Sequence, residues 1–149
     1  MPVVAVTSSA EETVELGRRI AAQLRPGDVV AFFGDLGAGK TTMIKGIASA
    51  LGVRDVVRSP SFVIATEYQG ALRVQHIDLY RLTEPSELTG IGFADLFSPD
   101  CVTLVEWADR AGPELPASSV RVEITAGDID RRSIRITGLR DEIESGPFS

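Results

Sequence analysis

The first third of the chain alternates between apolar runs and a helical repeat of apolar residues. Within residues 28–33, DVVAFF, the apolar side chains continue up to a glycine, which is typical of a strand buried on both faces of a parallel sheet. Over residues 16–24, leucine and isoleucine recur every four positions and predict an amphipathic helix. Ser9 and Glu12 form a capping-box pattern at its start, and residues 3–6 predict a short strand.

The middle of the chain predicts a hairpin and a second buried strand. Residues 62–68 and 72–80, FVIATEY and LRVQHIDLY, are strand-like and joined by a Gln69-Gly70 turn, so we expect them to pair. Residues 83–88 predict a short helix. Residues 101–107, CVTLVEW, form another continuous apolar run, which ends in a carboxylate.

The last part of the chain predicts two further strands and a tail. Residues 119–125 and 132–138, SVRVEIT and RSIRITG, alternate apolar and polar side chains, which predicts strands at the edge of the sheet. A length of 149 residues is about the size of one domain. We therefore expect a single domain over residues 1–138 and a C-terminal tail over residues 139–149.

Composition predicts a globular cytoplasmic protein. Hydrophobic residues make up 44% and charged residues 24% of the chain, which excludes a chain dominated by disorder. No apolar run approaches the ~20 residues that cross a bilayer, and the first residues lack the basic region of a signal peptide. The single cysteine, Cys101, predicts a buried core thiol rather than a disulfide.

A phosphate-binding motif follows the first buried strand. Residues 34–41, GDLGAGKT, fit G-x-x-x-x-G-K-[ST] without a mismatch, and a helical pattern follows to Gly52. The glycines let the backbone curl so that its N–H groups face the phosphates of a nucleotide. We expect Lys40 to reach the β- and γ-phosphates, Thr41 to ligate Mg²⁺ and Thr42 to hold the α-phosphate end. The nucleotide-binding residues predicted in this motif are Gly34, Asp35, Gly37, Ala38, Gly39, Lys40, Thr41 and Thr42.

Two carboxylates compete for the metal and the attacking water that a P-loop requires. Glu106 closes the apolar run VTLVE, and Asp78 closes the more polar segment LRVQHID. A carboxylate at the end of a neighbouring strand can hold the metal's water shell or orient water. Spacing alone does not rank the two, so both are predicted catalytic and metal-binding residues, together with Lys40.

Four other residues have a functional and a purely structural interpretation. Ser59 and Ser61 lie where many nucleotide switches place a loop that senses the γ-phosphate, although an ordinary turn explains them as well. Trp107 follows Glu106 and is predicted to stack on the base, with core packing as the alternative. His76 is the only histidine, which excludes a multi-histidine metal cluster and favours a packing role.

Composition also limits the ligand. The net charge of −6 argues against broad electrostatic capture of nucleic acid, because phosphate contacts need a basic surface. The chain contains no asparagine, so it lacks the Asn-Lys-x-Asp segment with which guanine-specific P-loop proteins usually read the base. ATP is therefore the expected nucleotide, and any RNA is expected to be held by a partner.

Four motifs occur along the chain in this order: GDLGAGKTT, SPSF, HIDLYRL and LVEW. Together they resemble the bacterial TsaE (YjeE) family, and the similarity covers roughly residues 16–107. One departure is Ser61, where the family usually has threonine, so the hydroxyl is kept and the stiffening methyl is lost.

This resemblance implies a fold, an activity and partners. The fold is that of P-loop NTPases, three α/β/α layers with a mostly parallel mixed sheet, and the activity is that of a Mg²⁺-dependent ATPase. By the same resemblance, Lys40 and Thr41 serve phosphate and magnesium, Asp78 and Glu106 serve the metal and its water, and Trp107 lies by the nucleotide. The family acts with the TsaB and TsaD proteins to make threonylcarbamoyladenosine beside the anticodon of ANN-decoding tRNAs, and tRNA is met through that complex.

Two other classes of function remain open from the sequence. A small-molecule kinase would use residues 79–97 as a lid and Arg81 as a phosphate clamp. A binding module would use the nucleotide only to order a docking surface. No arginine is clearly placed by the sequence as a finger, so we expect weak hydrolysis by the chain alone.

Overall fold

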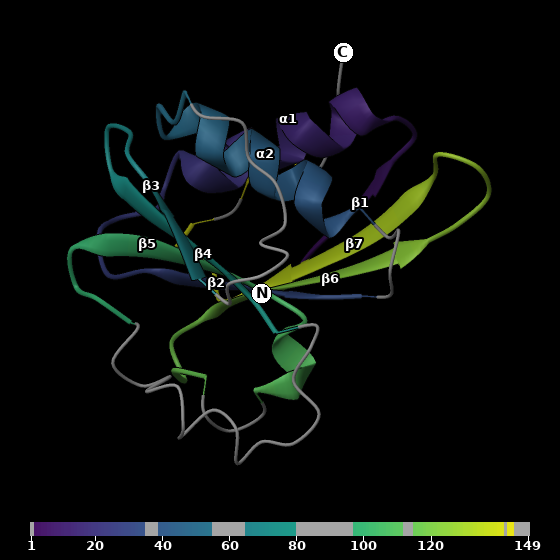
Figure 1. Ribbon diagram of the computed structural model, residues 1–149. Coiled ribbons are helices and arrows are strands. Elements are labelled where there is room, and N and C mark those ends of the chain that lie inside the picture. Colours follow the sequence, from purple (N-terminus) through teal and green to yellow (C-terminus); the bar gives the residue numbers. More distant parts are fainter. Residues whose placement is uncertain are drawn as a thin grey trace.

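The computed structural model describes residues 2–34, 39–54, 65–79, 97–111, 115–141 and 143–144 (Figure 1). Its centre is a seven-stranded sheet with the strand order β1-β7-β6-β2-β5-β4-β3. The described elements are β1 (Val3–Thr7), α1 (Ala10–Ala21), β2 (Val29–Phe33), α2 (Lys40–Ala50), β3 (Ala65–Tyr68), β4 (Arg73–Asp78), β5 (Cys101–Glu106), η1 (Ala108–Arg110), β6 (Val120–Ala126) and β7 (Arg132–Thr137). The helix predicted over residues 83–88 lies outside the described residues.

The central strands β6, β2, β5 and β4 run parallel to one another. The strands β7 and β3 run antiparallel to their neighbours, and β3 with β4 forms the predicted hairpin. The carboxyl ends of the parallel strands therefore meet at one edge of the sheet, which is where open α/β sheets bind ligands. The predicted α/β class with a mostly parallel mixed sheet is confirmed.

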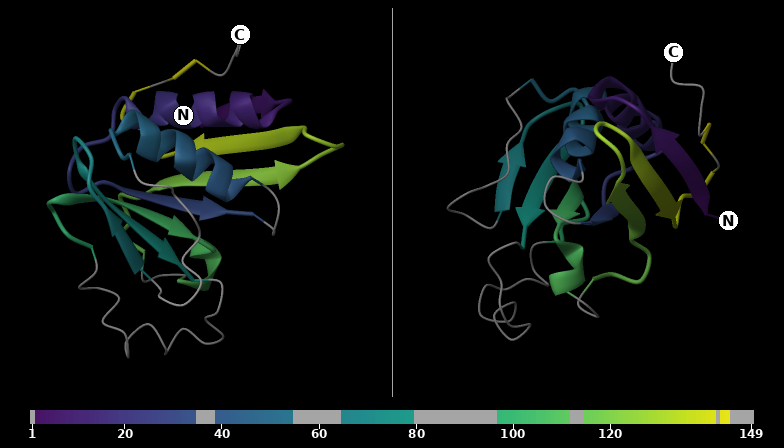
Figure 2. Two further views of the ribbon diagram at one scale, coloured as in Figure 1. Left: turned by 45° about the horizontal axis from the view of Figure 1, so that its top comes forward. Right: turned by 90° about the vertical axis from the view of Figure 1, so that its right-hand side faces the viewer.

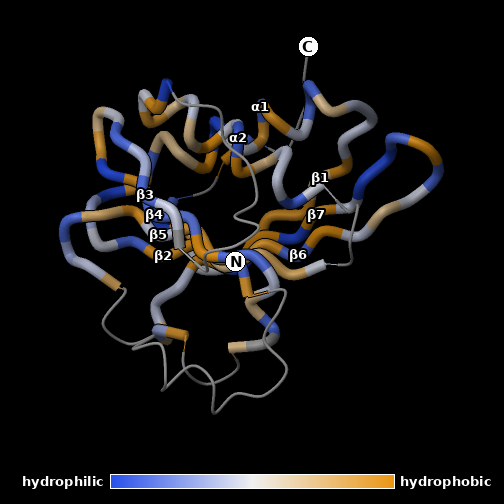
Figure 3. Tube along the Cα trace, in the orientation of Figure 1, coloured by the Kyte–Doolittle hydropathy of each residue, from blue (hydrophilic) through white to orange (hydrophobic). Residues whose placement is uncertain are grey.

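The helices α1 and α2 lie side by side on one face of the sheet (Figure 2). Val30 and Phe32 of β2 pack beneath them in the larger core cluster. Ala31 faces the other way and joins a second cluster with Ala108 of η1 and Leu115. Because β2 is buried on both faces, it is apolar throughout, and Figure 3 shows how apolar residues gather along the central strands.

The prediction that the late strands form the edge of the sheet is wrong. β7 and β6 lie inside the sheet, and β1 pairs outside β7. In β6, Val122 and Ile124 are buried on the helix side, whereas Arg121 and Glu123 are exposed on the other. The alternation of apolar and polar residues thus results from a solvent-exposed sheet face, which interior antiparallel strands can also have.

Two glycines let α1 and α2 approach closely. A Cβ at Gly17 would lie 2.6 Å from the carbonyl oxygen of Met43, and a Cβ at Gly46 would collide with the carbonyl of Val14. Helix backbones can come this close only where no side chain intervenes. The contact fixes α2, whose first turn follows the phosphate-binding motif, against the rest of the core.

We expect Gly46→Ala to lower the free energy of unfolding. Helix propensity alone would favour alanine by about 1 kcal/mol. The collision with the Val14 backbone outweighs this gain, because overpacking costs about 1–3 kcal/mol when backbone must move. Urea unfolding would measure the change, with Ser49→Ala on the exposed side of α2 as the control. A Gly46→Ala protein at least as stable as the natural chain would contradict this packing.

The segment after β7 packs against the end of α1. Leu139 and Ile143 contact the larger core cluster, and the Arg19 guanidinium donates to the carbonyl of Glu144 at 2.8 Å. The domain boundary expected at residue 138 stays a prediction. Cys101 is buried, as predicted. None of the helices in the described part of the chain is long and apolar enough to span a membrane.

Candidate functional site

The phosphate-binding motif lies between β2 and α2, as predicted. Gly34 has φ 150°, and Gly39, the N-cap of α2, has φ 105° in the left-handed region, which favours glycine at both positions. The N-cap residue Gly39 has no side chain with which to cap α2, and the first turn of the helix, residues 40–43, carries no acidic residue. In α1, by contrast, Ser9 caps the helix by accepting from the amide of Glu12 at 3.1 Å. Neither the N-cap residue nor the first turn of α2 therefore supplies a negative charge to the positive end of the helix, which is a position that suits an anion.

Lys40 is the first residue of α2 and is buried although it is charged. Its Nζ donates to the carbonyl oxygen of Gly34 at 2.5 Å. The same Nζ lies 3.4 Å from the centroid of the Trp107 ring, which is a cation–π distance. Lys40 stands near the end of the motif, and its side chain reaches back to Gly34, the first residue of the motif. Its ammonium therefore lies where the loop begins.

Thr41, Glu106 and His76 form a chain of hydrogen bonds beside Lys40. The Thr41 hydroxyl donates to Glu106 Oε1 at 2.8 Å, and Glu106 Oε2 lies 2.6 Å from His76 Nε2. Glu106 and His76 are almost completely buried. Both carboxylate oxygens are therefore held by neighbouring side chains, and the Glu106 carboxylate has one orientation.

Strand order and alternation bring these side chains together. β5 lies between β2 and β4, so the end of β5 faces the start of α2, which follows β2. Asp78 and Glu106 are register partners at the ends of β4 and β5. His76 and Asp78 lie two residues apart and therefore share a face of β4, the face whose Val74 packs in the larger core cluster with residues of α2.

His76 is fully buried, as the packing role favoured by its sequence context requires, and it also takes part in a hydrogen bond. The structure places it against Glu106, at the end of the next strand. Its other ring nitrogen, Nδ1, is buried and has no hydrogen-bond partner among the residues that the structure describes. A histidine two residues before the end of one strand and a carboxylate at the end of another were the available sequence signal, but only the strand order makes them neighbours.

The donor set at this edge suits magnesium. Thr41 offers a hydroxyl, and Asp78 and Glu106 offer carboxylates, which are the oxygen ligands that Mg²⁺ prefers. Within the described residues, no group of three or more His, Cys, Asp or Glu side chains could hold a metal ion on its own. Mg²⁺ in nucleotide sites is usually bound by one or two carboxylates together with phosphates, so the residues present fit this group.

The other predicted site residues are placed only in part. Trp107 has φ 58°, an uncommon left-handed conformation for a large residue, and such strain clusters at functional sites. Its contact is with Lys40, so the predicted stacking on a base stays a prediction. Thr42 is half-buried in the first turn of α2. Outside the described residues lie Asp35, Gly37, Ala38, Ser59, Ser61 and Arg81.

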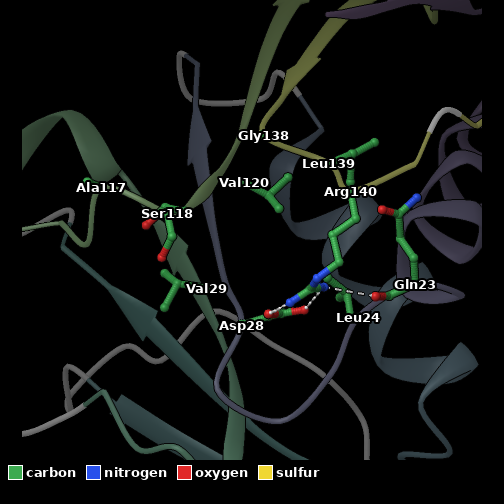
Figure 4. Close-up of a pocket in the computed structure, with 11 residues that line it drawn as sticks. Gln23, Leu24, Asp28, Val29, Ala117, Ser118, Val120, Gly138, Leu139 and Arg140 are labelled. Carbon is green, nitrogen blue, oxygen red and sulfur yellow. Dashed lines mark hydrogen bonds and ion pairs between the residues drawn. The ribbon is translucent and has the colours of Figure 1, made fainter. Parts of the chain in front are cut away.

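A separate cavity of about 380 Å³ lies at the opposite edge of the sheet, where β2 and β6 begin (Figure 4). The Arg140 guanidinium donates to both carboxylate oxygens of Asp28, at 2.6 and 2.7 Å, and to the carbonyl of Gln23 at 3.2 Å. The hydrogen bonds from Arg140 to the carboxylate lower the pKa of Asp28 below its ordinary value of 3.8, against the opposing effect of burial. The cavity is lined by Val29 and Val120, far from Lys40 along β2, so it is not the nucleotide site.

The Asp28–Arg140 pair predicts a particular acid dependence of stability. Because the pKa of Asp28 is lowered by folding, the pair stabilises the fold above pH 3.8 and loses this effect as the pH falls through the lowered pKa. We expect Arg140→Gln to lower the free energy of unfolding at neutral pH and to make its decrease toward about pH 3 shallower. Urea unfolding at both pH values would measure this, with exposed Arg135→Gln as the control. If the free energy of unfolding of Arg140→Gln fell with pH as steeply as that of the natural chain, the Asp28–Arg140 pair would not contribute to the acid dependence.

The fold and the edge at Lys40 define a P-loop nucleotide-binding enzyme of the α/β class. Residues 7–134 match the sequence model of the family described as "Threonylcarbamoyl adenosine biosynthesis protein TsaE". The chain therefore belongs to the TsaE family, whose members take part in the biosynthesis of threonylcarbamoyladenosine in tRNA.

Individual relatives agree with this family over most of their length. The tRNA threonylcarbamoyladenosine biosynthesis protein TsaE of Bacillus subtilis (strain 168) is 40% identical over 139 residues, which is 93% of this chain and 87% of the relative. The protein of the same name from Streptomyces coelicolor is 39% identical over 84% of this chain and 89% of its own. The crystal structure of Bacillus subtilis YdiB superposes with a TM-score of 0.79 at 36% identity, covering 93% of this chain and 86% of that chain.

Proposed function

We propose that this chain binds and hydrolyses Mg-ATP as the ATPase component of the bacterial machinery that makes threonylcarbamoyladenosine. It acts in the cytoplasm with TsaB and TsaD, on the adenosine beside the anticodon of ANN-decoding tRNAs. Family membership supports the pathway. One structural observation supports the activity: the Lys40 ammonium, the Thr41 hydroxyl and the Glu106 carboxylate converge at the start of α2.

Each of these groups has a distinct task in the proposed reaction. Lys40 neutralises charge that develops on the β- and γ-phosphates, and the loop amides from Gly34 to Thr42 hold the phosphate chain. Thr41, Asp78 and Glu106 hold Mg²⁺, which supplies charge neutralisation at the phosphates when bound. Glu106 also orients the attacking water and accepts its proton.

The remaining predicted residues complete the site. Asp35, Gly37 and Ala38 contribute loop backbone, and Ser59 and Ser61 are proposed to sense the γ-phosphate from a switch segment. Trp107 lies against the Lys40 ammonium, which supports a place beside the nucleotide. The proposed domain comprises residues 1–138, with residues 139–149 as a C-terminal extension.

The charge of the chain supports contact with tRNA through partners. A net charge of −6 gives the protein no general electrostatic attraction for a phosphate backbone. TsaD performs the transfer of the threonylcarbamoyl group, and the nucleotide cycle of this chain resets the TsaB–TsaD complex between rounds.

The proposal is tested by measuring ATP turnover and tRNA modification in parallel. We expect slow turnover by the purified chain, faster turnover with TsaB, TsaD and tRNA, and modification that requires all three proteins. Repeated modification at full rate after this chain is omitted would refute the pathway role. Phosphorylation of a small acceptor by the chain alone would favour a kinase instead.

A further inference from the structure

We propose that Arg132 binds the phosphates of the nucleotide from the Gly39 side of the loop. This assignment rests on the proposed nucleotide site and adds to it a second cation, supplied by a different part of the chain. Arg132 is the first residue of β7. The sequence motifs did not single it out, because it lies far from the P-loop in the chain.

The register of the sheet carries Arg132 to the level of the loop. Phe33, the last residue of β2, pairs with Glu123 of β6, and Ala126, further along β6, pairs with Arg132. β2 and β6 are parallel, so Ala126 and Arg132 lie past the end of β2, where its chain enters the phosphate-binding loop. Figure 1 shows the β6–β7 turn and the start of α2 on the same side of the molecule.

Alternation along β7 directs the side chain to the correct face. Ile134 and Ile136 are buried in the cluster beneath α1 and α2. Side chains two apart on a strand share a face, so Arg132 leaves β7 on the helix side as well. Arg135 leaves the same strand on the opposite side and is exposed.

The distances place Arg132 directly against the loop. Its Nε lies 3.7 Å from the position that a Cβ would take on Gly39, the N-cap of α2. Its Nη1 donates to the carbonyls of Ile129 and Arg131, at 2.9 Å each. These two bonds tie the guanidinium to the hairpin turn, so less conformational freedom is lost when an anion binds.

The chemistry of the group fits a polyphosphate. A guanidinium stays protonated at any pH in ordinary use, and its planar set of N–H donors matches two oxygens of one phosphate. The Lys40 ammonium lies at Gly34, where the loop begins, whereas the Arg132 guanidinium lies at Gly39, where α2 begins. The two cations therefore come to the two ends of the loop, one from α2 and one from β7. The negative charge of the phosphates, which Lys40 would otherwise neutralise alone, is then shared between Lys40 and Arg132.

The test compares ATP with tripolyphosphate, which has the phosphates but neither ribose nor base. Calorimetric titrations with Mg²⁺ would use the natural chain, Arg132→Gln and the matched control Arg135→Gln, which removes the same charge from the other face of β7. We expect Arg132→Gln to lower the affinity for both ATP and tripolyphosphate by between about tenfold and a hundredfold. Arg135→Gln should change either affinity by less than about twofold.

Several outcomes would overturn the assignment. If Arg132→Gln and Arg135→Gln lowered the affinities equally, the effect would be one of general charge. If Arg132→Gln lowered the affinity for ATP but not the affinity for tripolyphosphate, Arg132 would contact the nucleoside instead of the phosphates. Unchanged binding by a folded Arg132→Gln protein would exclude any contact with the nucleotide. If the natural chain bound neither ligand, the proposed function itself would fail.

A second measurement needs no variant. An arginine-selective dicarbonyl reagent would label the natural chain with and without tripolyphosphate, followed by peptide mass spectrometry. We expect tripolyphosphate to protect Arg132 and to leave the labelling of Arg135 unchanged. Labelling of Arg132 that is the same with and without the ligand would contradict the proposal even if Arg132→Gln did not fold.

Discussion

Replacing Lys40 with alanine is expected to reduce ATP affinity by at least about a hundredfold, since hydrogen bonds to charged groups contribute about 1.5–3 kcal/mol each and the ammonium serves two phosphates. The backbone loop would remain, but the phosphates would lose their main neutralising charge. Lys40 is buried, with its Nζ against Gly34 and Trp107, so its replacement removes the ammonium from the start of the loop. Calorimetry with Mg-ATP measures the loss directly.

The control for this variant is Lys45→Ala. Lys45 lies on the same helix but is exposed, so its replacement removes an equal charge without touching the loop. We expect Lys45→Ala to bind ATP like the natural chain. Similar affinity for ATP in Lys40→Ala and Lys45→Ala would show that the buried ammonium does not contact the phosphates.

Glu106→Gln is expected to separate binding from hydrolysis. Glutamine has nearly the same shape, and its side-chain oxygen can still accept from the Thr41 hydroxyl, so the loop geometry and ATP binding should persist. It cannot accept a proton from water, and the loss of a general base lowers rates by about 10²–10⁴-fold. Single-turnover hydrolysis in the partner complex, alongside ATP affinity, measures both properties.

Exposed Glu123 provides the matched control for this second variant. Glu123→Gln makes the same chemical change on the solvent side of β6 and should leave both binding and turnover unchanged. Undiminished hydrolysis by Glu106→Gln would show that Glu106 is not the base. If Glu106→Gln bound ATP without hydrolysing it and still supported tRNA modification as well as the natural chain does, the chain would belong to the binding-module class.

The local elements of the fold could be predicted because their causes are local. The run VVAFF is apolar since β2 is buried on both faces, and Ser9 starts α1 with a side-chain hydrogen bond that its spacing from Glu12 predicts. One detail differs: the Glu12 carboxylate accepts from the amide of Ser8, at 2.8 Å, rather than from that of Ser9. The spacing of Ser9 and Glu12 thus predicts the capping interaction, but not which of two successive amides donates to the Glu12 carboxylate.

Strand order is what the sequence did not specify. The alternating pattern of β6 and β7 predicted strands at the edge of the sheet, but the same pattern fits an interior strand with one exposed face, which is what the structure has. Two contacts of the candidate site depend on this order. His76 reaches Glu106 because β4 lies beside β5, and Arg132 reaches Gly39 because the β6–β7 turn closes beside β2.

The central claim, that the loop between β2 and α2 binds Mg-ATP, is tested most directly by calorimetric titration of the natural chain with ATP. We predict saturable binding of one ATP per chain in the presence of magnesium and weaker binding when magnesium is chelated. A folded protein that takes up no ATP under either condition would contradict the account.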